Sequence, residues 1–146
     1  IKNAEKFVDD TFLVLNGDCY STVDFAKLIQ KHNEKKSQIT MMLNKIPDCS
    51  DFGSAVLDND GRIIRFVEKE NKGEGLINIG IYAIESSVLK EMPANQKFSM
   101  EKDIFPKFVE KGQMFGIDMQ CYFIDFGIPA RLEQFRKDVE SGLLKL

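Results

Sequence analysis

The chain has 146 residues, of which 43% are hydrophobic and 29% charged, so its length and composition are those of one globular domain. Its net charge of −3 and pI near 5.3 argue against a nucleic-acid partner, because no basic stripe can neutralise phosphates. No apolar run is long enough to cross a bilayer and no secretion signal is visible, so we expect a cytoplasmic protein without a membrane partner.

The chain opens with residues at helical spacing, and a predicted strand over 12–15 follows at once. Four consecutive apolar residues before an Asn-Gly turn are typical of a strand buried on both faces of a mostly parallel sheet. This strand leads to Asp18, at the sheet edge where α/β proteins bind ligands. Because a domain rarely begins with a helix and then a central strand, we expect a further segment before residue 1.

An amphipathic helix is predicted after the N-cap signal at 21–24. From Phe25 to His32 the apolar side chains recur at helical spacing, so His32 is predicted to be a structural, partly buried residue. A strand over 38–43 follows, and a strand, helix and strand with this spacing predict a right-handed parallel crossover. The polar, proline-containing residues 44–50 are predicted to form a loop.

A β-hairpin and a long central strand are predicted next. The turn signal at 58–61 separates the apolar runs 52–57 and 62–67, which favours a hairpin. Residues 71–75 have the composition of a flexible loop. Residues 76–84 are apolar at all but three positions, so they form the longest predicted strand, and we expect it in the centre of the sheet.

The last third of the chain alternates helical and strand patterns. A helix is predicted from Ser99 to the stop signal at Gly112, and Pro106 either kinks it or opens a separate helix. The other predicted elements are a short helix, two strands and a final amphipathic helix, over 86–92, 115–119, 122–124 and 131–142.

Asp18 and Asp125 are far apart in the sequence, yet each follows a short apolar strand. Mg²⁺ takes oxygen ligands and is commonly held by one or two carboxylates together with substrate phosphates, so the pair suggests a metal site. Aspartates after strands are also common turn and N-cap residues. The pattern alone therefore leaves both interpretations open.

The three cysteines are far apart, form no Cys-x-x-Cys pair and accompany a single histidine, so neither a disulfide framework nor a zinc site is predicted. They are Cys19, Cys49 and Cys121. Cys19 follows Asp18 directly, which places its thiol near the suggested metal site. The simpler interpretation is a small buried residue, because nothing marks it as a nucleophile with a paired base.

Five short segments occur in an order that resembles the sugar 1-phosphate nucleotidyltransferases, also called nucleotide-sugar pyrophosphorylases. These segments are 15–18, 52–53, 67–69, 76–82 and 123–129. The resemblance spans the whole chain, and residues 75–78 with 98–99 downstream look most like the D-glycero-D-manno-heptose 1-phosphate guanylyltransferases. It implies a Rossmann-like, three-layer αβα fold with a mixed, mostly parallel central sheet, as the C-terminal portion of the nucleotide-diphospho-sugar transferase fold.

The resemblance also implies roles for individual residues. Asp18 and Asp125 match the two aspartates that bind Mg²⁺. Glu68 matches the acid that hydrogen-bonds sugar hydroxyls, and Lys69 the base that contacts the sugar phosphate. Asp18, Lys69 and Asp125 would then be the catalytic residues.

Two further residues match positions that face the sugar, and structural alternatives stay open for several of these assignments. Gly53 would offer its backbone to the sugar, or would only start a strand. Asn78 would face the sugar, because an amide in an apolar strand needs a partner from a ligand or a neighbouring loop. Glu68 and Lys69 could form a solvated strand end, and Tyr82 is predicted to be a core residue.

The family's Gly-rich nucleotide-binding loop is absent from this sequence. We therefore interpret residues 1–146 as the C-terminal, sugar- and metal-binding part of a single nucleotidyltransferase domain, inactive by itself. An unpaired sheet edge would favour homo-oligomers.

The resemblance implies a Mg²⁺-dependent enzyme that joins a sugar 1-phosphate to a nucleoside triphosphate, giving a nucleotide sugar and pyrophosphate. Heptose 1-phosphate with GTP is the expected pair, and glucose or mannose 1-phosphate is the alternative. A metal-dependent glycosyltransferase is a rival from another class, although residues 18–20 break its Asp-x-Asp motif. A non-catalytic regulatory module of the same fold is the third hypothesis.

Overall fold

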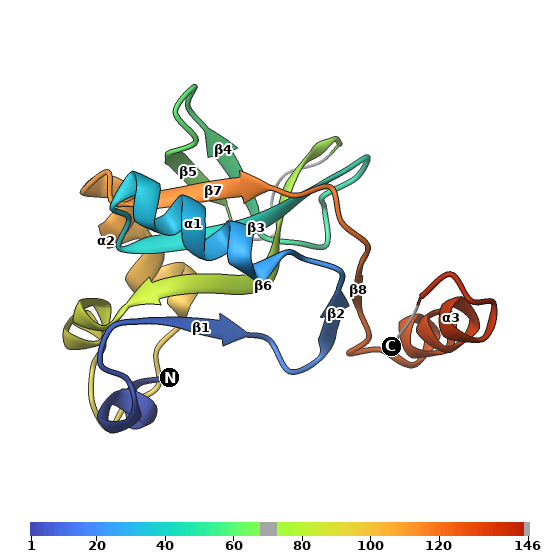
Figure 1. The fold of residues 1–146 in the computed structure, drawn as a ribbon, viewed down its shortest axis with the longest axis horizontal. Helices are drawn as coiled ribbons and strands as arrows, with labels where there is room; N and C mark the ends of the chain where they lie inside the picture. Colours follow the sequence, from blue (N-terminus) through green and yellow to red (C-terminus); the bar gives the residue numbers. More distant parts are fainter. Residues whose placement is uncertain (68–72, 145–146) are drawn as a thin grey trace.

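The computed structural model describes residues 1–67 and 73–144, which form a mixed sheet with helices on both faces (Figure 1). The strands are β1 (Thr11–Leu15), β2 (Cys19–Ser21), β3 (Ile39–Ile46), β4 (Ser54–Leu57), β5 (Ile63–Val67), β6 (Gly75–Glu85), β7 (Met114–Asp118) and β8 (Phe123–Asp125). The helices are α1 (Phe25–Lys35), α2 (Phe105–Glu110) and α3 (Pro129–Glu140), with 3₁₀ turns η1 (Lys2–Phe7) and η2 (Ser86–Glu91) and a π-helical turn η3 (Met100–Ile104).

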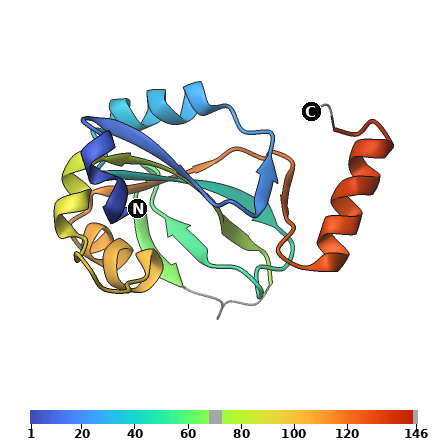
Figure 2. The same cartoon turned by 90° about the horizontal axis from the view of Figure 1, so that it is seen from below.

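The main sheet has the strand order β5-β4-β6-β3-β7, and β1 also pairs with β6 (Figure 1). Helix α1 covers one face, and α2 with η2 lies on the other (Figure 2). Along β6, Ile79 and Ile81 pack in the cluster that contains Leu28 of α1, whereas Tyr82 and Ile84 pack in the cluster that contains α2. The predicted three-layer arrangement is therefore observed.

The sheet is mixed, as predicted, but the balance of its pairings differs from the expectation. Among the described ladders of the main sheet only β3–β7 is parallel, and antiparallel pairing dominates where mostly parallel pairing was expected. Strands β1 and β3 are both antiparallel to β6 and so run parallel to each other, as the crossover prediction requires. The long strand β6 lies between β1 and β3 and is antiparallel to both, which explains much of the unexpected antiparallel pairing.

Strand β1 is not buried on both faces, contrary to the prediction. It pairs with β6 alone in the described structure, and Leu13 and Leu15 are 37% and 51% exposed. A run of apolar residues cannot distinguish a doubly covered strand from an apolar strand at a sheet edge, because the sequence does not reveal its neighbours. An exposed sheet edge is where we expect homo-oligomers to form, and that association stays a prediction.

The prediction that residues 76–84 form the longest, central strand is confirmed. Strand β6 pairs with β3 along one edge, and with β4 and β1 along the other. Its ladder with β3 shifts between Met41, opposite Tyr82, and Leu43, opposite Asn78. At this bulge Gly80 has φ of +74°, and its carbonyl accepts the N–H of Asn16 at 2.8 Å. Bulges of this kind re-aim neighbouring side chains.

Most other local predictions are confirmed, with small shifts in bounds. Asp24 caps α1 by accepting the N–H of Lys27 at 3.0 Å, and the predicted hairpin forms as β4 and β5. Strand β3 continues to Ile46, so the first part of the predicted loop is strand. Pro106 lies in the first turn of α2, a separate helix after η3, where a proline lacks no hydrogen bond.

His32 is a structural residue, as predicted, and is fully buried. Its Nδ1 lies 2.8 Å from Thr40 Oγ1 and its Nε2 lies 2.8 Å from Glu85 Oε1, which also accepts from the Thr11 hydroxyl. Partial burial would by itself raise the pKa of Glu85, but the hydrogen bonds from Thr11 and His32 hold it below the usual value of 4.5. This network joins α1, β3, β6 and β1.

The lowered pKa of Glu85 predicts a contribution to acid sensitivity. A depressed folded-state pKa stabilises the fold above the unfolded-state pKa, and this stabilisation is lost as the pH falls through the folded value. The free energy of unfolding of the wild type should therefore fall more steeply than that of Glu85→Gln between about pH 6 and pH 3. Urea unfolding at several pH values measures the slopes, and parallel pH profiles would contradict this role.

Helix α3 lies apart from the main sheet, beside the small ribbon of β2 and β8 (Figures 1 and 2). None of its residues is fully buried, and it attaches through ring contacts of Phe135 with Tyr20 and Phe126. None of the described helices has both the length and the apolar character that a membrane span requires.

Candidate functional site

Asp18 and Asp125 lie beside each other on the ribbon formed by β2 and β8. Cys19 pairs with Asp125 in the antiparallel ladder, and the Phe126 N–H donates to the Asp18 carbonyl at 2.9 Å. A β-carbon on Gly127 would lie 3.2 Å from Asp125 Oδ1 and 3.3 Å from Asp18 Oδ2. The two carboxylates therefore face one small space, which the missing side chain of glycine leaves open.

The position of this pair differs from the expectation in one respect. Asp18 lies in the turn after β1, at the edge of the main sheet, but Asp125 ends β8, which belongs to the separate two-stranded ribbon. The pairing of β2 with β8, and not the main sheet itself, brings the two acids together. Neither carboxylate caps a long helix.

The donor set at this place fits a hard divalent cation. Within residues 1–67 and 73–144 no cluster of three or more His, Cys, Asp and Glu side chains could hold a metal. Two carboxylate groups that face one gap are nevertheless the usual protein share of a Mg²⁺ site, since waters and substrate phosphates supply the other ligands. Asp18 and Asp125 would hold the ion.

The Cys19 thiol lies next to the two carboxylates, and their negative charge affects its pKa. Its Sγ donates to Asp18 Oδ1 at 3.7 Å. Burial, together with the charges of Asp18 and Asp125, raises the pKa of Cys19 to about 12. The group is therefore a protonated thiol near neutral pH, and a nucleophilic role is not supported. The two interpretations of Cys19, a small buried residue and a thiol near the suggested metal site, both hold in part. The side chain is half-buried, and it lies beside the two carboxylates.

A small cavity of about 170 Å³ opens next to Asp125. Residues of β6, the ribbon, η3, the turn after β1 and the segment before β4 line it: Asn16, Cys19, Asp51, Phe52, Gly53, Asn78, Ile79, Glu101, Phe123 and Asp125. The Asn78 N–H donates to the Gly53 carbonyl at 2.8 Å, so these two predicted sugar-facing residues are adjacent. Small-molecule sites commonly have about 300–1,000 Å³, so this cavity fits part of a ligand rather than a whole nucleotide sugar.

The amide of Asn78 has partners on its own strand. Its Nδ2 donates to the Tyr82 hydroxyl at 2.7 Å, and its Oδ1 accepts the Gly80 N–H at 2.9 Å. The expectation that a ligand or a neighbouring loop must supply the partner is therefore wrong. The bulge at Gly80 makes the local arrangement possible. Tyr82 is 3% exposed, so its predicted core position is confirmed.

The predicted residues Glu68 and Lys69 lie outside the described residues. The structure adds four polar side chains to the prediction: Asn16, Asp51 and Glu101 line the cavity, and Arg131 donates to Asp125 Oδ2 at 3.2 Å. Glu101 comes from the π-helical turn, and its Oε2 accepts the Ser99 hydroxyl at 2.8 Å. Asn16 stands in a recognised motif, but no sequence spacing pointed to Glu101 or Arg131.

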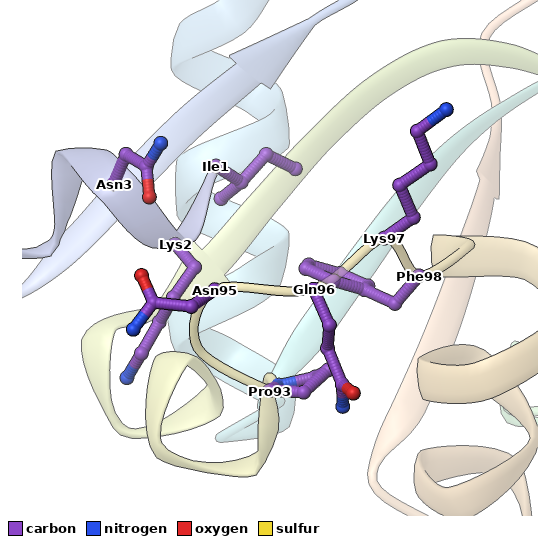
Figure 3. A pocket seen from close by; sticks show the side chains of 8 residues that line it. All are labelled: Ile1, Lys2, Asn3, Pro93, Asn95, Gln96, Lys97 and Phe98. Carbon is purple, nitrogen blue, oxygen red and sulfur yellow. The ribbon is translucent and has the colours of Figure 1, made fainter.

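A second, larger pocket of about 360 Å³ lies between the start of the chain and residues 93–98 (Figure 3). Lys2 and Asn95 face this pocket, and none of the described residues that line it is acidic. The Lys2 ammonium donates to the Leu89 carbonyl at 2.8 Å and to Glu5. None of the predicted site residues that the structure describes lines this pocket, so it is separate from the carboxylate pair.

Comparison with known proteins gives concordant results. The family model described as nucleotidyl transferase matches residues 1–142. A D-glycero-alpha-D-manno-heptose 1-phosphate guanylyltransferase of Aneurinibacillus thermoaerophilus is 30% identical over 141 residues, which cover 96% of this chain and 61% of the relative. A UTP–glucose-1-phosphate uridylyltransferase of Synechocystis sp. is 35% identical over 133 residues, or 87% of this chain and 34% of the relative.

Among solved structures, the crystal structure of HddC from Yersinia pseudotuberculosis superimposes with a TM-score of 0.82 and 32% identity. The match covers 94% of this chain and 60% of that one. The chain therefore spans from about a third to about three fifths of the length of these proteins.

Proposed function

Because this chain belongs to the nucleotidyl transferase family, we propose that the full-length protein joins a sugar 1-phosphate to a nucleoside triphosphate. The products are a nucleotide sugar and pyrophosphate. Residues 1–146 would be the C-terminal, sugar- and metal-binding part of the domain, since the family's Gly-rich nucleotide-binding loop is absent from them. The reaction consumes a nucleoside triphosphate, which is in keeping with a cytoplasmic protein.

The convergence of Asp18 and Asp125 over Gly127, beside the cavity at Gly53 and Asn78, carries this proposal. The carboxylates would hold Mg²⁺, and Gly53 and Asn78 would meet the sugar. Lys69 would contact the sugar phosphate, and Glu68 the sugar hydroxyls. The cavity is small enough to suit one sugar ring and lies next to the metal ligands, as the attacking phosphate of a sugar 1-phosphate requires.

The proposed chemistry is an in-line displacement at the α-phosphorus. An oxygen of the sugar 1-phosphate forms the new P–O bond, and the bond to the β-phosphate breaks with release of pyrophosphate. A phosphate monoester is mostly dianionic near pH 7, since its second pKa is about 6, so no side-chain base is needed. Mg²⁺ supplies positive charge that screens the repulsion between the phosphates. The chain would align the reacting groups, and Asp18 and Asp125 would hold the ion at the site.

We further propose heptose 1-phosphate and GTP as the substrates, with glucose or mannose 1-phosphate as the alternative. The heptose 1-phosphate guanylyltransferase and HddC matches support this choice, because they cover nearly all of this chain and a larger share of their own length than the glucose enzyme does. The sequence of residues 75–78 and 98–99, which resembles that of the heptose 1-phosphate guanylyltransferases, supports it as well.

A pyrophosphate-release assay tests the function. The full-length protein is incubated with Mg²⁺ and each pairing of four nucleoside triphosphates with heptose, mannose and glucose 1-phosphates. Release that requires both substrates is expected, and fastest with heptose 1-phosphate and GTP. Sugar transfer from a preformed nucleotide sugar would indicate a glycosyltransferase instead, and binding without turnover would indicate a regulatory module.

A further inference from the structure

The guanidinium of Arg131 lies between the two parts of the site. Its Nη1 is 3.2 Å from Asp125 Oδ2, its Nη2 is 3.4 Å from Asp51 Oδ2, and its central carbon is 5.2 Å from the ring centre of Phe52. A planar guanidinium can make all three contacts at once, because its donors form a rigid fork and its face stacks on rings. Arg131 thus connects a proposed metal ligand with the segment that precedes Gly53.

The two oxygens of Asp125 have different partners. Oδ1 accepts the Gly127 N–H at 2.8 Å and lies on the side that faces Asp18 Oδ2. Oδ2 accepts from Arg131. Because both oxygens are held, the carboxylate plane is fixed with Oδ1 toward Asp18. An outer contact on the second oxygen is how metal-binding carboxylates are commonly oriented.

The contact with Asp51 has a different character. The Asp51 carboxylate is 75% exposed and its distance to Arg131 is longer, so this ion pair contributes little free energy. The stacking on Phe52 adds a contact that does not depend on the Asp51 charge. Asp51 and Phe52 both line the cavity, so their placement shapes one of its walls.

We propose that Arg131 is a positioning residue, which aims the Asp125 carboxylate at the cation and holds segment 51–53 as one wall of the sugar cavity. The inference rests on the proposed function for the identity of the ion and the sugar. It adds a link between them, because one side chain from α3 sets the geometry of both.

A direct electrostatic effect of Arg131 on cation binding would have the opposite sign to the proposed positioning effect. Arg131 carries a positive charge near the proposed ion, so its removal would by itself strengthen cation binding. If Arg131 orients the Asp125 carboxylate, its removal should weaken cation binding, since loss of an outer-shell partner typically costs about 10–100-fold in metal affinity or activity. The sign of the change in affinity therefore separates the two roles.

The test uses Mn²⁺ as the probe and electron paramagnetic resonance to count free ions, with the full-length protein and no substrate. Arg131→Met should raise the dissociation constant about tenfold or more, and Arg131→Lys should raise it by a smaller factor, because it keeps the charge and loses the fork. Arg136→Met is the matched control, since Arg136 lies on the same helix and forms an exposed ion pair with Glu133 at 3.7 Å. It should bind Mn²⁺ as the wild type does.

Unchanged or tighter Mn²⁺ binding in a folded Arg131→Met variant would overturn the proposal. If that variant does not fold, as judged by thermal melting, Arg131→Lys decides: weaker binding supports orientation, and wild-type binding overturns it. These titrations need no turnover, so they remain decisive even if the wild type releases no pyrophosphate, an outcome that would count against the proposed function alone.

The cavity wall is tested by kinetics. Arg131→Met should raise KM for the sugar 1-phosphate and lower kcat, whereas a purely structural defect would lower the fraction of active enzyme and leave KM unchanged. Asp51→Asn added to Arg131→Met should change KM no further, because Arg131 no longer holds the segment. An additive increase would contradict the shared role.

Discussion

Replacing Asp18 with Asn in the full-length protein is expected to lower kcat for pyrophosphate release by at least about a hundredfold. Charge stabilisation by a bound metal contributes several kcal/mol to such a barrier, and each 1.36 kcal/mol corresponds to a factor of ten. The amide keeps the shape of the side chain and removes the charge that would hold the ion. Because Asp18 is exposed, the free energy of unfolding should change by less than about 0.5 kcal/mol.

Steady-state kinetics with varied Mg²⁺, combined with urea unfolding, measures both effects. Asp24→Asn is the matched control, since Asp24 caps α1 and asparagine is an equally good N-cap. Turnover that stays at the wild-type level in Asp18→Asn would remove Asp18 from the proposed metal site, and with it the observation that carries the functional proposal.

Replacing Gly80 with Ala is expected to destabilise the fold by about 3 kcal/mol, of which about 1 comes from the positive φ and about 2 from overpacking. A β-carbon there would lie 2.4 Å from Asn16 Nδ2 and 2.9 Å from Asn16 Cβ, at a buried position with φ of +74°. Asn16 must therefore move, and because it lines the cavity, KM for the sugar 1-phosphate should rise as well.

Urea unfolding measures the loss, and two variants separate its causes. Gly112→Ala has the same conformational problem, with φ of +64°, but its β-carbon would make only ordinary contact, at 3.5 Å from Arg62. It should cost about 1 kcal/mol. Adding Asn16→Gly to Gly80→Ala should restore part of the stability. Equal losses in Gly80→Ala and Gly112→Ala would show that the contact with Asn16 is unimportant.

Parts of the main sheet were predictable where a single local sequence pattern determined the element. The long apolar run of β6 and the turn before β5 could form only a central strand and a hairpin. The position of β1 was not predictable, because Leu13 and Leu15 are apolar residues at an edge and the sequence does not show which strands lie beside them. The antiparallel insertion of β6 between β1 and β3 joins residues far apart in the chain, and periodicity carries no information on such pairing.

The site was predictable to the extent that short motifs carry it. Asp18, Gly53, Asn78 and Asp125 stand in recognised segments, and the structure places them around one region. Asn78 showed the limit of reasoning from polarity, because its partners lie two and four residues further along its own strand. Arg131 gave no signal, since residues six apart do not touch each other in a helix or a strand, and only the bend between β8 and α3 brings it to Asp125.

The ladder between β2 and β8 has a consequence for the order of events during synthesis. Its two strands lie near opposite ends of the chain, so this pairing has very high contact order and forms late relative to local hairpins and helices. A nascent polypeptide that still lacks residue 125 can collapse into much of its sheet, yet it has only one of the two acids. The proposed ability to hold a divalent ion should therefore be acquired abruptly, when β8 leaves the ribosome.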